Sequence, residues 1–214
     1  MTPARRRAIF RRLAAANPSP RSELEYSTPF ELLVAVVLSA HTTDRSVNAA
    51  TRRLFPLANT PAAIARLGVR GLKPYLKSIG LHNAKAKNVA ALAAQILELH
   101  GGEVPRSREE LEALPGVGRK TASVVLNIAF GAPEIAVDTH IFRVANRTGL
   151  ATGKTPLAVE RALTETTPTA YRHNAHHWLL LHGRYVCTAR KPACPRCLIA
   201  DLCEYPHKTA HAGV

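Results

Sequence analysis

The chain has 214 residues, 46% of them hydrophobic, which is enough for one large domain or two small ones with a buried core. Lysine and arginine number 29 against 15 acidic residues, so the formal net charge is +14. A charge of this size indicates a polyanionic partner, either nucleic acid or an anionic membrane surface. The membrane alternative is the weaker one, because no apolar run approaches the roughly 20 residues that a spanning helix needs.

The first segment is basic enough to resemble a transit peptide, but it has no apolar core and no cleavage site. It is better interpreted as a helix over residues 4–16 that Asn17 and Pro18 end.

The next segment, FELLVAVVLSA over residues 30–40, is apolar on nearly all sides. Thr28, Pro29 and Glu31 supply a cap, a proline at the first helical position and a capping-box glutamate, so we expect a central buried helix. A buried strand is the alternative because of the three valines, but the length and the cap favour a helix.

Helical signals continue to the end of the chain. One helix is predicted to begin at Thr60-Pro61 and end near Gly68, and another covers residues 84–100 and ends at Gly101-Gly102. Further helices are expected over 107–114, 121–130 and 139–149, from Thr155-Pro156 onward, and over 172–187. Since no alternating strand pattern competes, the fold class is predicted to be all-α, with roughly ten helices.

The stretch LPGVGRKTA, residues 114–122, predicts a glycine hairpin between two helices. Pro115 ends the first helix, and Gly116 and Gly118 allow positive φ and close approach of the backbone. The N–H groups beside the start of the second helix would form a cradle for a phosphate. An ordinary turn between packed helices is the alternative, but Arg119 and the net charge favour contact with the DNA backbone.

Lys120 follows that hairpin directly. It could be one more phosphate contact. However, a helix N-terminus and the neighbouring Arg119 both disfavour an ammonium group, and a neutral lysine is a nucleophile that can form a Schiff base with a sugar aldehyde carbon.

Asp138 in AVDTHIFRV is the candidate for a second catalytic group. A carboxylate could stabilise the positive charge that develops on a sugar as its base departs, and could deprotonate the lysine or a water. Asp138 is also well placed to cap the helix that follows it. Capping alone and capping combined with catalysis both remain open.

The four cysteines lie in one segment with the spacing C-x6-C-x2-C-x5-C, namely Cys187, Cys194, Cys197 and Cys203. A disulfide framework would be spread through a secreted chain, so a metal or cluster site is favoured. Structural zinc usually uses two tight cysteine pairs, whereas four thiolates in a compact run suit a 4Fe–4S cluster. The loop TARKPA carries Arg190 and Lys191, with Arg184 upstream and Arg196 inside the C-x2-C pair, so the cluster would fix a basic loop against DNA.

His173 and His177 lie four residues apart on a predicted helix. Zinc binding would require a third ligand, so these histidines are interpreted as core or DNA-side residues.

Together, LPGVGRKTA, VDTHIFRV, HHWLLLHGRY and the cysteine tail resemble the endonuclease III family of bacterial DNA glycosylases and abasic-site lyases, from the first helix to about His207. The resemblance implies a six-helix barrel over 22–132 and a cluster domain made of 1–21 and 133–214, with a DNA-binding cleft between the two domains. A damaged nucleotide would be flipped into that cleft.

The same resemblance makes Lys120 the Schiff-base nucleophile, Asp138 the catalytic carboxylate, the cysteines the ligands of a 4Fe–4S cluster, and Gly116 and Gly118 the phosphate-binding hairpin. It places the family's wedge residues at His41 and Leu81. The family usually has glutamine where this chain has His41, so the contact with the orphaned partner base is open, and a solvent-facing His41 is the alternative.

The expected function is therefore removal of oxidised pyrimidines from double-stranded DNA, followed by nicking at the abasic site. The alternatives are a mismatch or pyrimidine-dimer glycosylase with the same machinery, a non-catalytic helix–hairpin–helix DNA-binding module, and a zinc-ribbon nucleic-acid binder. We expect a monomer in the cytoplasm of a bacterium, associated with the nucleoid and not with a membrane.

Overall fold

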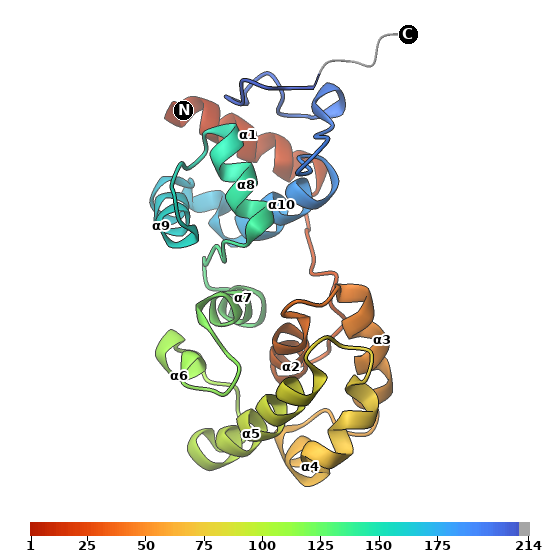
Figure 1. Ribbon diagram of the computed structural model, residues 1–214. Helices are drawn as coiled ribbons and strands as arrows, with labels where there is room; N and C mark the ends of the chain where they lie inside the picture. The colour runs from red at the N-terminus through yellow and green to blue at the C-terminus, as the bar shows by residue number, and fades with distance from the viewer. Residues whose placement is uncertain (210–214) are drawn as a thin grey trace. The chain divides into compact units, whose positions relative to one another are not determined.

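The computed structural model describes residues 1–209, and this part of the chain contains ten α-helices, two short 3-10 helices and no β-strand (Figure 1). The helices are α1 (Pro3–Ala16), α2 (Pro29–Ser39), α3 (Asp44–Leu54), α4 (Pro61–Leu76), α5 (His82–His100), α6 (Arg108–Glu112), α7 (Arg119–Phe130), α8 (Thr139–Thr148), α9 (Pro156–Thr166), η1 (Thr169–Tyr171), α10 (Arg172–Tyr185) and η2 (Cys194–Arg196). The prediction of an all-α fold is confirmed.

Threonine caps explain where several helices begin. The hydroxyl oxygens of Thr28, Thr60 and Thr155 each accept a hydrogen bond from the N–H group three residues on, at 3.1–3.2 Å, and a proline follows each cap. The Glu31 carboxylate accepts from the Ser27 N–H at 2.5 Å, one residue further back than a capping box predicts.

The structure departs from the sequence prediction in two places. The predicted end near Gly68 is confirmed as a break, because Gly68 leaves the helical conformation at φ 62°, but a second helical stretch that was not predicted continues α4 to Leu76. Helix α3 was not predicted, because its sequence DRSVNAATRRL is mostly polar, although Thr43 caps it through a hydroxyl bond to the Ser46 N–H at 3.2 Å.

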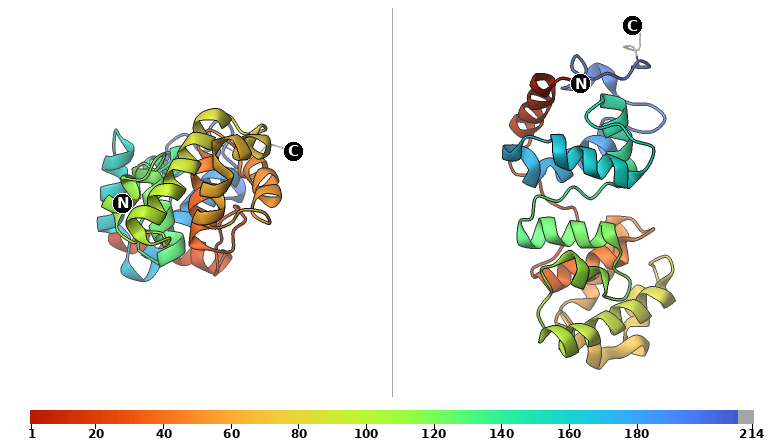
Figure 2. Two further views of the ribbon diagram at one scale, coloured as in Figure 1. Left: turned by 90° about the horizontal axis from the view of Figure 1, so that it is seen from below. Right: turned by 90° about the vertical axis from the view of Figure 1, so that its left-hand side faces the viewer.

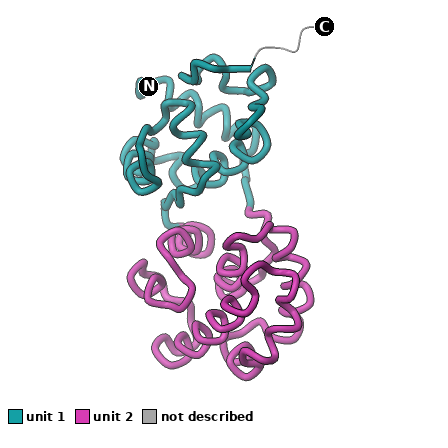
Figure 3. The backbone as a smooth tube through the Cα atoms, in the orientation of Figure 1, with its two compact units in different colours: residues 1–21, 132–214 teal, residues 22–131 magenta. Residues whose placement is uncertain are grey.

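The chain divides into two compact units (Figure 3). One unit is Ser22–Gly131, and the other combines Met1–Arg21 with the described chain from Ala132 onward.

In the Ser22–Gly131 unit, α2 is the central helix, as predicted. Every residue from Phe30 to Leu38 is buried, and α2 packs against α3, α5 and α7. Helix α5 also packs along α4 (Figure 2). Three loops of this unit contain candidate site residues: His41 lies between α2 and α3, Leu81 between α4 and α5, and Gly116 between α6 and α7.

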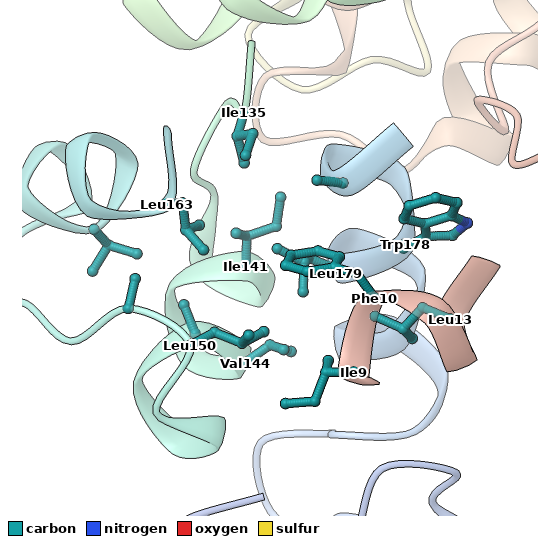
Figure 4. Close-up of a cluster of buried hydrophobic side chains, with 14 of the residues drawn as sticks. Ile9, Phe10, Leu13, Ile135, Ile141, Val144, Leu150, Leu163, Trp178 and Leu179 are labelled. Carbon is teal, nitrogen blue, oxygen red and sulfur yellow. The ribbon is translucent and has the colours of Figure 1, made fainter. Parts of the chain in front are cut away.

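The other unit is built around α8 and α10, against which α1 and α9 pack. Its core contains Phe10, Ile141 and Leu179 (Figure 4). The Trp178 indole N–H, at the edge of this core, donates to the Asn17 carbonyl at 2.8 Å, which ties the end of α1 to α10. No helix within residues 1–209 is long and apolar enough to cross a membrane.

Candidate functional site

The glycine hairpin lies between α6 and α7, as the sequence predicts. Gly116 has φ 80°, and a Cβ there would lie 2.8–2.9 Å from side-chain atoms of Asn88 on α5, so only glycine fits. The buried Val117 anchors the turn, because its N–H donates to the Leu114 carbonyl at 3.1 Å. Gly118 is the N-cap of α7 and has no side chain with which to cap the first turn. The hairpin therefore presents the positive end of α7 to an anion.

Arg119 and Lys120 are the first two residues of α7, and both side chains are exposed. Burial begins only at Ala122 and continues through Asn127, so Lys120 lies in the exposed first turn of the helix, ahead of its buried part. A substrate can therefore reach the Lys120 amine without displacing any core residue.

His41 and Leu81 are exposed, and they are the two non-glycine residues with positive φ, 55° and 59°, in the described chain. The left-handed conformation costs about 1–3 kcal/mol for a residue with a Cβ, and a leucine adopts it rarely. Leu81 nevertheless stands at the N-cap of α5 with 66% of its surface exposed. An apolar side chain held in a strained and exposed position indicates a functional role.

These loops are neighbours within their unit. A Cβ built on Gly80 would lie 3.4 Å from the His41 carbonyl oxygen, so the chain before Leu81 runs directly past His41. Helix α5 links them to the hairpin, because Asn88 packs against Gly116. The structure thus brings together His41, Leu81 and the hairpin, three features that lie far apart in the sequence.

Asp138, in the other unit, is the N-cap of α8. Its Oδ1 atom accepts the N–H groups of both His140 and Ile141, at 2.9 and 2.8 Å. The capping role is therefore present. Because both bonds go to Oδ1, the cap does not use the second carboxylate oxygen of the half-buried Asp138.

The four cysteines line one cavity at the end of α10, and none of them forms a disulfide. Burial, reinforced by the neighbouring cysteines, raises the pKa of the Cys197 and Cys203 thiols. Two N–H groups point at sulfur: that of Tyr205 donates to Cys203 Sγ at 3.5 Å, and the Arg147 guanidinium to Cys187 Sγ at 3.7 Å. Such donors are typical of the sulfurs of iron–sulfur clusters.

Four thiols that line one cavity, each able to bind a different iron, suit a 4Fe–4S cluster. Within residues 1–209, no group of three or more His, Cys, Asp or Glu side chains is placed to hold one metal ion. Zinc bound by four thiolates would require sulfurs about 3.8 Å apart, from Zn–S bonds of about 2.3 Å. In a 4Fe–4S cluster each cysteine binds a different iron, so the sulfurs lie farther apart while still lining one cavity.

The loop between Cys187 and Cys194 is held by Arg147, which the sequence analysis did not single out. The Arg147 guanidinium donates to the carbonyls of Thr188 and Ala189, at 2.7 and 2.8 Å, and lies over the Tyr205 ring at 4.8 Å. One turn earlier on α8, Arg143 donates to the Cys187 carbonyl at 2.8 Å. Arg147 and Arg143 lie inside the helix predicted over 139–149, but nothing in their spacing reveals that their partners are carbonyls in a distant loop.

The predicted basic residues around the cluster occupy different surroundings. Arg190 and Lys191 are exposed at the tip of the loop, and Arg196 is exposed beside it, whereas Arg184 is half-buried on α10. His177 is a core residue, as one of the two interpretations expected, and burial, with the nearby His173, lowers its pKa to about 4.

Residues 34–169 match the HhH-GPD superfamily of base excision DNA repair proteins, and residues 187–203 match the iron–sulfur binding domain of endonuclease III. The second match begins at Cys187 and ends at Cys203. The chain is also similar to endonuclease III of Haemophilus influenzae, 58% identical, and of Escherichia coli, 59% identical, with 97% of this chain and 99% of each relative covered.

Two solved structures of DNA glycosylases also align with nearly the whole chain. A trapped endonuclease III–DNA covalent intermediate, an estranged-adenine complex, aligns with a TM-score of 0.88 and 43% identity, covering 95% of this chain and 96% of that one. A thermostable thymine-DNA glycosylase aligns with a TM-score of 0.83 and 25% identity, over 94% and 96%.

Proposed function

We propose residue roles for a chain that belongs to the endonuclease III family of base excision DNA repair proteins. The protein is a DNA glycosylase with AP lyase activity; it binds DNA and carries an iron–sulfur cluster. The open questions are which residues carry out the chemistry and which bases are removed.

Lys120 is the nucleophile. Its amine forms a bond to C1′ of the damaged nucleotide as the bond between C1′ and the base breaks, and the base leaves with the electron pair and a proton. The sugar ring then opens to a Schiff base, C2′ loses a proton and the bond to the 3′ phosphate breaks, which nicks the strand. The exposed position of Lys120 directly behind an uncapped helix N-terminus carries this assignment. A structural relative trapped as a covalent intermediate with DNA supports it.

Asp138 stabilises the positive charge that develops on the sugar as the base departs, and it is the group that accepts a proton during excision. The support is the division of its oxygens, since the cap uses Oδ1 twice and leaves Oδ2 unused.

The DNA contacts follow from exposure and charge. Gly116, Gly118 and Arg119 bind a backbone phosphate, and His41 and Leu81 fill the gap that a flipped nucleotide leaves. The cysteine ligands Cys187, Cys194, Cys197 and Cys203 would hold a 4Fe–4S cluster, which when bound fixes the loop bearing Arg190 and Lys191 against the backbone, with Arg184 behind it.

The substrates are oxidised pyrimidines and abasic sites in double-stranded DNA, on which the protein acts as a monomer in the bacterial cytoplasm, at the nucleoid. A mismatch glycosylase is the second candidate, because one structural relative at 25% identity is a thymine-DNA glycosylase. Release of thymine glycol or dihydrouracil, but not of thymine from G·T pairs, would support the first candidate.

Borohydride trapping on abasic duplex DNA tests the nucleophile. The wild type should give a covalent complex, and Lys120→Gln should abolish it while DNA affinity changes by less than about threefold, since one charged contact among many is lost. Lys154→Gln, which removes an exposed lysine in the other unit, is the control and should trap normally. Undiminished trapping in Lys120→Gln would assign the nucleophile to another residue.

A further inference from the structure

Lys85, on the second turn of α5, is a buried lysine that no step described so far uses. Only 5% of its surface is exposed, although lysine is among the residues least often buried. Its Nζ atom donates to the carbonyl oxygens of Leu38, at 2.9 Å, and Ala40, and to the Thr42 hydroxyl, at 2.8 Å. An ammonium group has three hydrogens, and each meets an oxygen.

The three acceptors surround His41. Ala40 and Thr42 are its immediate neighbours in the chain, and both are bound to the same Nζ atom. A peptide segment held on either side of one residue has little freedom at that residue. Lys85 therefore fixes the backbone at the position where His41 adopts φ 55° and points into solvent.

The same residue also reaches the second left-handed position. The Lys85 main-chain N–H donates to the Leu81 carbonyl at 3.0 Å, which forms the first turn of α5 directly behind Leu81. Gly80 packs against the His41 carbonyl, so the two loops touch where Lys85 holds them. Through one main-chain and three side-chain hydrogen bonds, Lys85 connects both strained residues.

Ordinary helix capping does not require this arrangement. The Leu38 carbonyl is buried and needs a protein donor, but the oxygens of Ala40 and Thr42 lie in partly exposed surroundings where water could satisfy them. Burial lowers the pKa of Lys85, so placing its amine here carries a desolvation cost. The bonds to Ala40 and Thr42, which water could replace, are explained by the geometry that they impose on His41 between them.

We propose that Lys85 is a positioning residue that holds the His41 and Leu81 loops in the conformation that occupies the gap opened by nucleotide flipping. The proposal deepens the proposed function and rests on the roles assigned there to His41 and Leu81. It predicts that loss of Lys85 weakens the processing of paired lesions, whose opened state must be held by side chains, more than that of lesions already unpaired.

The test is single-turnover excision of dihydrouracil from two duplexes, one with the lesion paired to adenine and one with it inside a short mismatched bubble. Lys85→Met should reduce the rate on the paired substrate by about 10- to 100-fold, the range expected for lost hydrogen bonds to a charged group, and on the bubble by less than about threefold. Lys87→Met removes the same charge from an exposed position on the same helix, and its ratio of the two rates should match that of the wild type.

A double-mutant cycle with His41→Ala tests the mechanism. If Lys85 acts partly through His41, the loss in the double variant on the paired substrate should be smaller than the product of the two single losses, because one of the two positioned residues is already gone. Losses that multiply, or a Lys85→Met variant that slows both substrates equally, would overturn the proposal.

Two further measurements keep the outcome decisive. If Lys85→Met is unfolded at the assay temperature, Thr42→Val can be used instead, because it removes one hydrogen-bond acceptor of the Lys85 Nζ atom. Thr42→Val should reduce the rate on the paired substrate by about three- to tenfold and the rate on the bubble by less. Fluorescence of 2-aminopurine opposite a stable abasic-site analogue reports directly on the partner base and should differ between wild type and Lys85→Met. An unchanged signal would refute the positioning role. A wild type that excises dihydrouracil from neither duplex would instead contradict the proposed substrate class.

Discussion

Replacing Asp138 in two ways separates its cap from its chemistry. In Asp138→Asn the amide oxygen can take the place of Oδ1 and accept the N–H groups of His140 and Ile141, whereas Asp138→Ala loses both bonds. Because asparagine caps about as well as aspartate, Asp138→Asn should change the free energy of unfolding by less than about 0.5 kcal/mol. Asp138→Ala should lower it by about 1 kcal/mol.

The effect on catalysis should follow the opposite pattern. Both variants lack the second carboxylate oxygen, so both should lose base excision by about 10²- to 10⁴-fold, or roughly 3–5 kcal/mol of transition-state stabilisation. Trapping on DNA that already contains an abasic site should fall less, since no base has to leave. The expected loss of transition-state stabilisation is larger than the roughly 1 kcal/mol of folding stability that Asp138→Ala loses. Asp138→Asn should show the same loss of excision although its stability is nearly unchanged, so unfolding cannot explain that loss.

Urea unfolding and single-turnover excision of thymine glycol from a duplex measure the two effects on the same preparations. Wild-type excision by Asp138→Asn would reduce Asp138 to a cap. Equal unfolding free energies for Asp138→Asn and Asp138→Ala would show instead that the two N–H bonds contribute nothing to stability.

Two further predictions concern the cluster-bearing unit. Burial lowers the pKa of His177 to about 4 from an ordinary 6.5, so between these values the unfolded chain binds more protons than the folded protein. The contribution of His177 to the free energy of unfolding is therefore complete above about pH 6.5 and falls by up to about 3 kcal/mol towards pH 4. In His177→Phe the free energy of unfolding should differ less between pH 7 and pH 4.5 than in the wild type, and an equal difference would contradict this. Arg147→Met loses the bonds to Thr188 and Ala189, so limited trypsin cleavage between Arg190 and Lys191 should accelerate about tenfold or more, whereas exposed Arg161→Met should behave like the wild type.

Most helix boundaries could be predicted because their causes are local. A threonine cap followed by proline, or a glycine with positive φ after the last turn, acts within four residues of the chain, as at Thr28, Thr155 and Gly149. Helix α3 was missed because only three apolar residues, Val47, Ala50 and Leu54, mark its buried face among many polar ones, although they stand at helical spacing; this face packs against α2 and α4.

The residues of the candidate site likewise fall into those that a local sequence pattern marks and those that only the fold reveals. Asp138 and the four cysteines could be found from residue type and spacing, since a cap and a ligand run are local patterns. Lys85 could not, because its partners are oxygens 43–47 residues earlier in the chain, two of them on the main chain. A carbonyl acceptor has no sequence signature, so contacts of this kind emerge only from the fold. Arg147 was missed for the same reason.

Leu81 shows how a conflict between local preference and fold can itself carry information. Glycine and asparagine adopt the left-handed conformation with the least strain, and the residue directly before Leu81 is itself a glycine, Gly80. The chain instead places there a leucine that is 66% exposed, which gains no burial to offset the strain of its backbone. Natural sequences are consistent across levels except where function imposes the exception. The benefit of Leu81 is therefore expected in a state in which its side chain is covered, and a DNA duplex with one nucleotide removed from its stack provides such a state.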